Sequence, residues 1–212
     1  MSVIDYERFN DYFLHQKAVD DEFFYITENP PGLRLICIVN EDGKIESYYP
    51  HEYNFSLPPQ IESSLKGIYE NWGFGFVFDG FIVYPSTTLN AYDRFDLLIR
   101  SLMTGEDKDL EYIVFDVLDV DAFKEKNCDI PYYMRRQKAV TLFSNYDNVT
   151  HIKELPILYQ GKDKDQIKIL YGLDKDSHTF GLLIFLTERR YSFTRSNNVL
   201  VVDDSGQIYD DQ

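Results

Sequence analysis

Short apolar runs alternate with amphipathic stretches along this chain, and their periods predict its strands and helices. Residues 111–118, EYIVFDVL, form the strongest strand pattern because β-branched and aromatic residues dominate them. Ile61, Leu65 and Ile68 recur at i, i+4 and i+7, which predicts a helix over residues 60–70 with one buried face. Further strands are predicted at residues 23–27, 33–39, 44–49, 73–84, 180–186 and 198–202, and further helices at 3–17, 91–103, 165–173 and after Pro131.

Glycine and proline mark the expected connections between these elements. Residues 40–43, NEDG, predict a hairpin, and Asp79-Gly80 predicts a bend or hairpin within residues 73–84. The stretch ENPPGLR, residues 28–34, predicts a tight turn between two strands. This mixture predicts an α+β fold with antiparallel hairpins. Because no low-complexity linker interrupts the pattern, we expect a single domain over residues 1–212, with a core at 23–202 and an acidic C-terminal end at 203–212.

Composition narrows the class of protein. The chain is 44% apolar and 16% aromatic, which is enough to order a compact fold. Its 21 basic and 36 acidic residues give a formal charge of −15, which repels phosphate backbones and disfavours duplex DNA as a ligand. Cys37 and Cys128 are too few for a disulfide framework, and the histidines lack metal-ligand spacing. Since no signal or membrane segment is apparent, we expect an intracellular protein, cytoplasmic or nuclear.

Four segments occur in an informative order: ENPPGLRLICIV, FVFDGFIVY, YIVFDVLDVDAF, and FGLLIF followed by YSFTRSNNVLVV. Their order and spacing resemble the covalent nucleotidyltransferase superfamily, which comprises mRNA capping guanylyltransferases and ATP-dependent DNA and RNA ligases. The resemblance covers residues 23–202 and implies a fold of antiparallel sheets flanked by helices. Members generally carry a further OB-fold domain. Because only residues 203–212 follow the last segment, we expect no OB-fold here.

The resemblance also implies that the chemistry of the family has been lost. In the family, a lysine in a Lys-x-Asp-Gly-x-Arg signature attacks the α-phosphate of ATP or GTP, and acidic and lysine residues of later motifs hold metal and phosphate. Matched position by position, the catalytic positions are occupied here by Asn29, Pro31, Phe81, Phe180, Val201 and Asp203. An amide side chain cannot form the phosphoramide bond, so we expect a pseudoenzyme with no catalytic residues, no metal and no cofactor.

Binding could outlast catalysis at four positions that the resemblance retains. Phe115 matches the aromatic residue that stacks on the purine, and Arg34 could contact a ribose or a phosphate. Asp79 and Asp116 could accept hydrogen bonds in a residual pocket. The alternatives are that Phe115 packs in the core, that Arg34 is a surface residue and that Asp79 belongs to a turn.

These expectations favour a non-catalytic subunit in RNA capping and processing or in DNA end metabolism. It would bind a protein partner, a nucleotide or an RNA 5′ end. One alternative is an active guanylyl- or adenylyltransferase that uses a displaced lysine such as Lys44 or Lys66. Another is an acidic adaptor or inhibitor that binds proteins and only resembles the family.

Overall fold

This computed structural model describes residues 22–48, 55–105, 109–144, 150–173, 178–191 and 199–202, together with the backbone of residues 208–210. The chain forms two compact units that are interleaved in the sequence. The first unit comprises residues 1–30, 130–133 and 156–212, and the second comprises residues 31–129 and 134–155. The helix expected at residues 3–17 lies outside the described residues.

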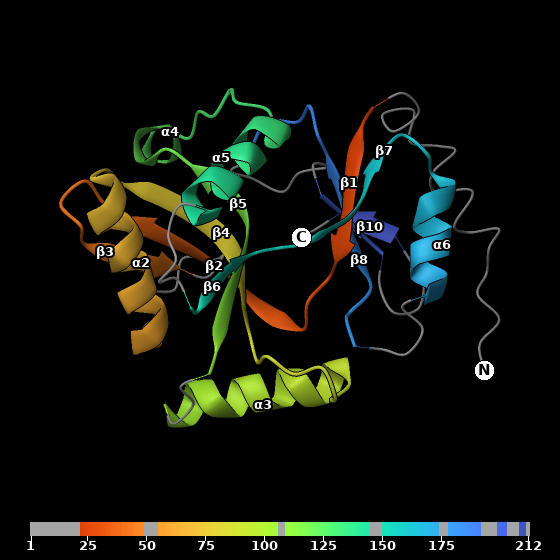
Figure 1. Cartoon of the computed structure of the whole chain (residues 1–212), viewed down its shortest axis with the longest axis horizontal. Helices are drawn as coiled ribbons and strands as arrows, with labels where there is room; N and C mark the ends of the chain where they lie inside the picture. The colour runs from red at the N-terminus through yellow and green to blue at the C-terminus, as the bar shows by residue number, and fades with distance from the viewer. Residues whose placement is uncertain are drawn as a thin grey trace. The chain divides into compact units, whose positions relative to one another are not determined.

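The first unit contains a five-stranded antiparallel sheet in the order β10-β9-β8-β1-β7. Its strands are β1 (Phe24–Glu28), β7 (Ile157–Gly161), β8 (Leu182–Leu186), β9 (Val199–Val202) and β10 (Ile208–Asp210). Helix α6 (Asp165–Leu173) lies beside this sheet in Figure 1, and buries Ile167 against Phe24 and Ile26 of β1. Strand β10 falls in the C-terminal end, where the sequence pattern predicted no strand.

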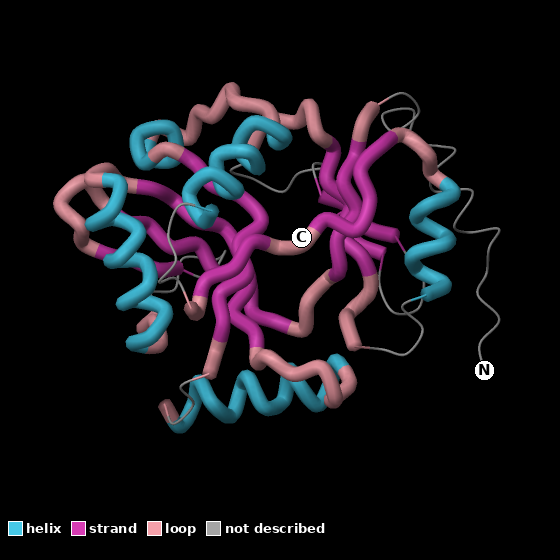
Figure 2. The backbone as a smooth tube through the Cα atoms, viewed as in Figure 1, coloured by secondary structure: helices cyan, strands magenta, loops and turns pink. Residues whose placement is uncertain are grey.

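The second unit is built on another five-stranded sheet, in the order β3-β2-β4-β5-β6, and the strands of both sheets are magenta in Figure 2. Its strands are β2 (Gly32–Val39), β3 (Ile45–Tyr48), β4 (Phe76–Val83), β5 (Glu111–Leu118) and β6 (Ile152–Glu154). Its helices are α2 (Pro59–Trp72), α3 (Ala91–Thr104), α4 (Val120–Lys124) and α5 (Tyr132–Ser144), whose first two residues belong to the first unit. The pairing is antiparallel except between β5 and β6, which are parallel.

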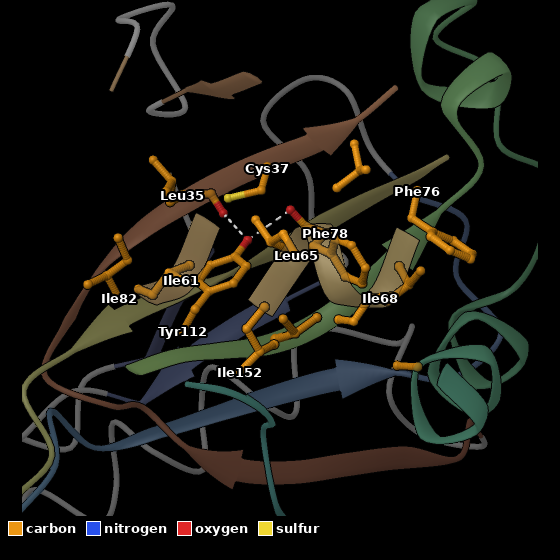
Figure 3. Packing of buried hydrophobic residues seen from close by; sticks show 14 of the residues in the cluster. Leu35, Cys37, Ile61, Leu65, Ile68, Phe76, Phe78, Ile82, Tyr112 and Ile152 are labelled. Carbon is orange, nitrogen blue, oxygen red and sulfur yellow. Dashed lines mark hydrogen bonds between the residues drawn. The ribbon is translucent and has the colours of Figure 1, made fainter. Parts of the chain in front are cut away.

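The core of the second unit joins one face of this sheet to α2 (Figure 3), and it also includes Leu98 of α3 and Ala139 and Leu142 of α5. Ile61, Leu65 and Ile68 are fully buried, as their helical spacing predicts. The hydroxyl of buried Tyr112 lies 2.7 Å from the carbonyl oxygen of Leu35 and 2.9 Å from that of Phe78, so its proton is shared between two neighbouring strands. An apolar core surrounds this polar contact, and the hydroxyl is satisfied without water.

The sequence pattern locates several elements closely. The strand at 111–118 and the helix at 165–173 have the predicted bounds. Helix α3 ends at Thr104 and is capped by Gly105, whose φ of 67° is left-handed. The mixed α+β architecture is confirmed. Among the described residues, no helix is both long enough and apolar enough to cross a membrane.

The prediction of a bend at Asp79-Gly80 is wrong. Strand β4 runs through both residues and pairs with β2 on one side and β5 on the other, so Asp79 does not act as a turn residue. Gly80 is needed for close packing, because a Cβ atom there would lie 2.5 Å from the carbonyl oxygen of Ile113. The Asp-Gly signal is ambiguous, since a strand in contact with another backbone selects glycine as strongly as a turn does.

The expected turn at ENPPGLR is also different in the structure. Strands β1 and β2 belong to different sheets, so residues 29–31 lead from one sheet to the other and do not reverse the chain in a hairpin. Gly32 is again a position of close approach, because a Cβ atom would lie 2.6 Å from the carbonyl oxygen of Ile82. The two prolines suit this link because they fix φ and need no hydrogen-bond acceptor for an amide N–H.

Candidate functional site

A β-bulge gathers the four candidate binding residues on one face of the second sheet. Asp79 pairs with Asp116 and Gly80 pairs with Val114, which leaves Phe115 as the extra residue of β5. Arg34 of β2 is the register partner of Phe81 on β4. Side-chain contacts link Arg34 to Asp79 and Phe115, and Phe115 to Phe81, while Asp116 joins this cluster as the register partner of Asp79. The cluster thus has five members: Arg34, Asp79, Phe81, Phe115 and Asp116. We call it the β4 cluster.

Arg34 and Asp79 form a two-point ion pair across β2 and β4. Arg34 Nε donates to Asp79 Oδ1 at 3.1 Å, and Nη2 donates to Oδ2 at 2.9 Å. The Asp79 side chain is fully buried, whereas that of Arg34 is 28% exposed. A planar guanidinium on a carboxylate gives a stiff, directional contact. Asp79 is therefore engaged inside the protein and fixes the position of the arginine.

Asp116 has its own arginine, which sequence reasoning did not place in the site. Arg135 of α5 donates to both carboxylate oxygens at 2.8 Å, and each of the two side chains is 4% exposed. The backbone N–H of Val117 adds a third hydrogen bond at 2.9 Å. Burial raises the pKa of the Asp116 carboxyl, and Arg135 opposes that rise. A sequence signal that could have found it is the Arg135-Arg136 pair near the start of the helix after Pro131.

The two aspartates face each other as register partners on β4 and β5. Like charges directly opposite across strands are destabilising, so each carboxylate needs a cation of its own. Arg34 serves Asp79 from β2, and Arg135 serves Asp116 from α5. This arrangement makes both aspartates structural acceptors within the second unit.

Phe115 contacts two other members of the β4 cluster, Phe81 and Arg34. Its ring centroid lies 5.3 Å from that of Phe81 at an interplanar angle of 43°, and the Arg34 guanidinium carbon lies 5.3 Å from the same centroid. The Phe115 residue is 4% exposed. The contacts are of the kind expected for core packing, and they occupy surface that a stacked base would need.

In the first unit, the structure places two of the expected catalytic positions side by side. The backbone N–H of Asn29 donates to the carbonyl oxygen of Gly181 at 2.8 Å, and the N–H of Phe180 donates to that of Asn29 at 2.8 Å. The Asn29 side-chain Nδ2 donates to the carbonyl oxygen of Phe180 at 3.3 Å. Gly181 has a φ of 101°, which favours glycine at this crossing. Asn29 thus extends the β1–β8 ladder.

The remaining expected catalytic positions show apolar or backbone surroundings. Pro31 is buried at the start of the second unit, and Phe81 belongs to the β4 cluster. Val201 is 4% exposed in β9 and pairs with Leu183 of β8. Asp203 lies outside the described residues. Among the residues that the structure describes, no group of three or more His, Cys, Asp and Glu side chains could hold a metal ion.

The two displaced-lysine candidates lie in ion pairs away from the β4 cluster. Lys44 Nζ donates to Glu46 at 2.7 Å, and Lys66 Nζ donates to Glu62 at 2.6 Å. The hydrogen bond to Glu46 raises the pKa of Lys44, whereas a nucleophilic lysine needs a lowered pKa. A pocket of about 450 Å³ adjoins Lys44. It is lined by Lys44, Ile45, Glu46, Ser47, Tyr48, Phe55, Ser56, Leu57 and Glu62.

Comparisons with known proteins give a fold but no close relative. No protein-family model and no curated protein sequence matches this chain. Among solved structures, a chain named Pmar-Lig_Pre. matches with a TM-score of 0.76 and 15% identity, over 92% of this chain and 44% of the other. A Lig E DNA ligase matches with a TM-score of 0.61 and 12% identity, over 89% of this chain and 64% of the other.

A third match is the ATP-dependent DNA ligase of bacteriophage T7, in complex with ATP. Its TM-score is 0.56 at 13% identity, over 99% of this chain and 78% of the ligase. This chain therefore spans less than half the length of the first structure, slightly less than two thirds of the second and 78% of the third. At these identities the similarity defines the fold, which is that of the nucleotidyltransferase domain of ATP-dependent DNA and RNA ligases.

Proposed function

We propose that this chain is a pseudoenzyme, a nucleotidyltransferase-like domain that binds without transferring a nucleotide. Its role would be that of a binding or scaffolding subunit in RNA capping and processing or in DNA end metabolism. The observation that carries the proposal is the environment of Asn29, the residue that the resemblance matches to the nucleophilic lysine. Its backbone and side chain bond to Phe180 and Gly181, and an amide nitrogen has no free lone pair for attack on phosphorus.

The second unit supports the same proposal. Transfer of a nucleotidyl group needs cations or metal ions on the phosphates. Here the carboxylates of Asp79 and Asp116 accept from Arg34 and Arg135, and Phe81 stands where the resemblance expects an acidic residue. Charged groups that neutralise each other within a fold stabilise its geometry and are less available to a substrate.

The net charge indicates the kind of partner. A formal charge of −15 favours a basic protein surface or a small ligand over a long nucleic-acid duplex, because the phosphate backbone is repelled over its whole length. We therefore expect the partner to be a protein of an RNA- or DNA-processing complex, or a nucleotide or RNA 5′ end held locally.

A labelling experiment tests the proposal directly. The purified chain would be incubated with ATP or GTP and with magnesium or manganese, and its intact mass would be measured after denaturation. A bacteriophage T7-type DNA ligase treated in parallel serves as the positive control. We expect no covalent adduct on this chain. An adduct that Lys44→Arg or Lys66→Arg removes would overturn the proposal in favour of transfer by a displaced lysine.

Thermal unfolding distinguishes the binding partners. The chain would be unfolded with ATP, GTP, a methylated cap analogue or a 5′-phosphorylated oligonucleotide. A ligand at one hundred times its dissociation constant adds about 2.7 kcal/mol to the free energy of unfolding. At this chain length that corresponds to a rise of roughly 5–10 °C in Tm. A rise that Phe115→Leu abolishes would support a nucleotide or RNA-end ligand, whereas no rise with any of them supports a protein partner.

A further inference from the structure

The aromatic part of the β4 cluster is filled by the protein itself. We propose that the Phe81 side chain closes the stacking surface of Phe115, so that a planar aromatic ligand binds there only when Phe81 is removed or displaced. The inference rests on the proposed function and deepens it. With Phe81 in place the wild-type site excludes nucleotides, and the binding role belongs to a protein partner.

The strand geometry explains why Phe81 reaches Phe115. The bulge in β5 releases Phe115 from a one-to-one pairing with β4. Phe81 follows Gly80 on β4, and its ring centroid comes to 5.3 Å from that of Phe115. Favourable aromatic pairs have centroids about 4.5–7 Å apart, so Phe81 lies at the distance that a stacked ligand ring would take.

The surroundings of this ring pair do not depend on Phe81. Asp79 is fully buried and binds Arg34 at two points, which fixes the guanidinium 5.3 Å from the centroid of the Phe115 ring. Phe81 is only partly buried, so its truncation would open a recess bordered by the Phe115 ring and the fixed guanidinium. A purine can stack in such an open recess while its ribose stays in solvent.

The charges of the site indicate which aromatic ligand it would take. Asp79 already balances the charge of Arg34, and a chain of net charge −15 repels further anions. The opened site therefore offers ring stacking but no net positive charge for a triphosphate. We expect adenosine to bind about as tightly as ATP. A site in which phosphate contacts dominate affinity would instead bind ATP much more tightly than adenosine.

The test compares adenosine binding by calorimetry to the wild-type chain, to Phe81→Ala and to the double variant Phe81→Ala/Phe115→Leu. The wild-type chain should show no saturable binding. Since stacking on an aromatic side chain contributes about 1–3 kcal/mol, Phe81→Ala should bind about 5- to 150-fold more tightly than wild type. The double variant should lose this gain, because leucine keeps apolar bulk and offers no ring face.

Two outcomes would overturn the inference. Either the wild-type chain binds adenosine as tightly as Phe81→Ala does, or a cooperatively folded Phe81→Ala chain binds none. If Phe81→Ala fails to fold, Phe81→Val, which also removes the ring, replaces it with the same expectations. Adenosine has no phosphate and cannot form the covalent adduct that would refute the proposed function, so the two failures are distinguishable.

Discussion

The buried pair of Asp116 and Arg135 gives a quantitative prediction about stability. Asp116→Asn keeps the shape of the side chain but leaves the Arg135 guanidinium without an anion at a position where it is 4% exposed. Breaking one member of a buried ion pair typically costs about 3–5 kcal/mol. The variant also removes the repulsion between Asp116 and the opposite Asp79, which offsets part of that cost. We expect a loss at the lower end of the range, about 3 kcal/mol.

Circular dichroism during thermal and urea unfolding measures this loss. About 3 kcal/mol should lower the Tm by roughly 6–12 °C at this chain length. The matched control is Glu62→Gln, which breaks the exposed i, i+4 pair with Lys66 on α2. Exposed pairs of this type contribute roughly 0.5 kcal/mol or less, so the control should shift the Tm by about 2 °C at most. Equal shifts in the two variants would refute the idea that the buried pair supports the fold.

The pH dependence of wild-type stability at Asp116 has a definite sign. Burial raises the pKa of Asp116 in the folded state, so between the unfolded and folded pKa values the folded chain binds more protons than the unfolded one. The contribution of this carboxyl to stability is then fully present below the unfolded pKa of about 4 and falls as the pH rises through the folded value. Urea unfolding of the wild-type chain at pH 4.5 and at pH 7 measures this component, and a stability that does not fall between the two would contradict a raised pKa.

Three further predictions concern the second unit. Gly80→Ala should destabilise the chain by about 1–3 kcal/mol in urea unfolding, because its Cβ atom would clash with a backbone carbonyl. The control Gly172→Ala, whose Cβ atom would have no neighbour within 4 Å, should be neutral or slightly stabilising. Equal effects of the two substitutions would contradict the close-packing explanation. Tyr112→Phe should cost about 1–2 kcal/mol, since it removes a buried hydroxyl shared by two carbonyl oxygens, and an unchanged urea midpoint would show that this bond contributes nothing. Cys37 is buried, and burial raises the pKa of its thiol to about 12. Peptide mapping after iodoacetamide treatment at pH 8 should therefore find Cys37 unmodified in the native chain and modified in urea. Rapid labelling of the native chain would disprove this protection.

The sequence predicts the parts of this fold in which local pattern and tertiary packing agree. Residues 111–118 are rich in β-branched and aromatic side chains and become β5 with unchanged bounds, and the i, i+4, i+7 spacing in α2 matches its buried face. The order of the four motif segments likewise anticipated the ligase nucleotidyltransferase fold. These signals are periodic or ordered along the chain, so each one involves many residues.

Features that depend on contact between distant segments were not accessible in the same way. The Asp79-Gly80 pair is typical of a turn, but glycine is required there because the backbone carbonyl of Ile113 lies too close for a Cβ atom. Ile113 is 33 positions further along the chain. Arg135 joins the site through its ion pair with Asp116, which lies 19 positions earlier, and no local sequence spacing predicts that contact. Pairings of this kind are set by register and by a bulge, and neither has a sequence signature as clear as hydrophobic periodicity.

The β4 cluster shows how buried charges and an aromatic face can be satisfied within a single fold. A site that holds charged groups and an aromatic face for a substrate is costly to keep empty, because buried charges need partners and apolar faces need cover. In this chain Arg34 and Arg135 partner the two aspartates, and Phe81 covers Phe115. Each of these groups therefore has a partner within the protein. If these partners stabilise the fold, then Asp79→Ala, which frees Arg34, should lower stability and raise the affinity for ATP relative to adenosine in the Phe81→Ala background. Equal affinities for the two ligands in that background would show that the Arg34–Asp79 pair does not govern charge at the site.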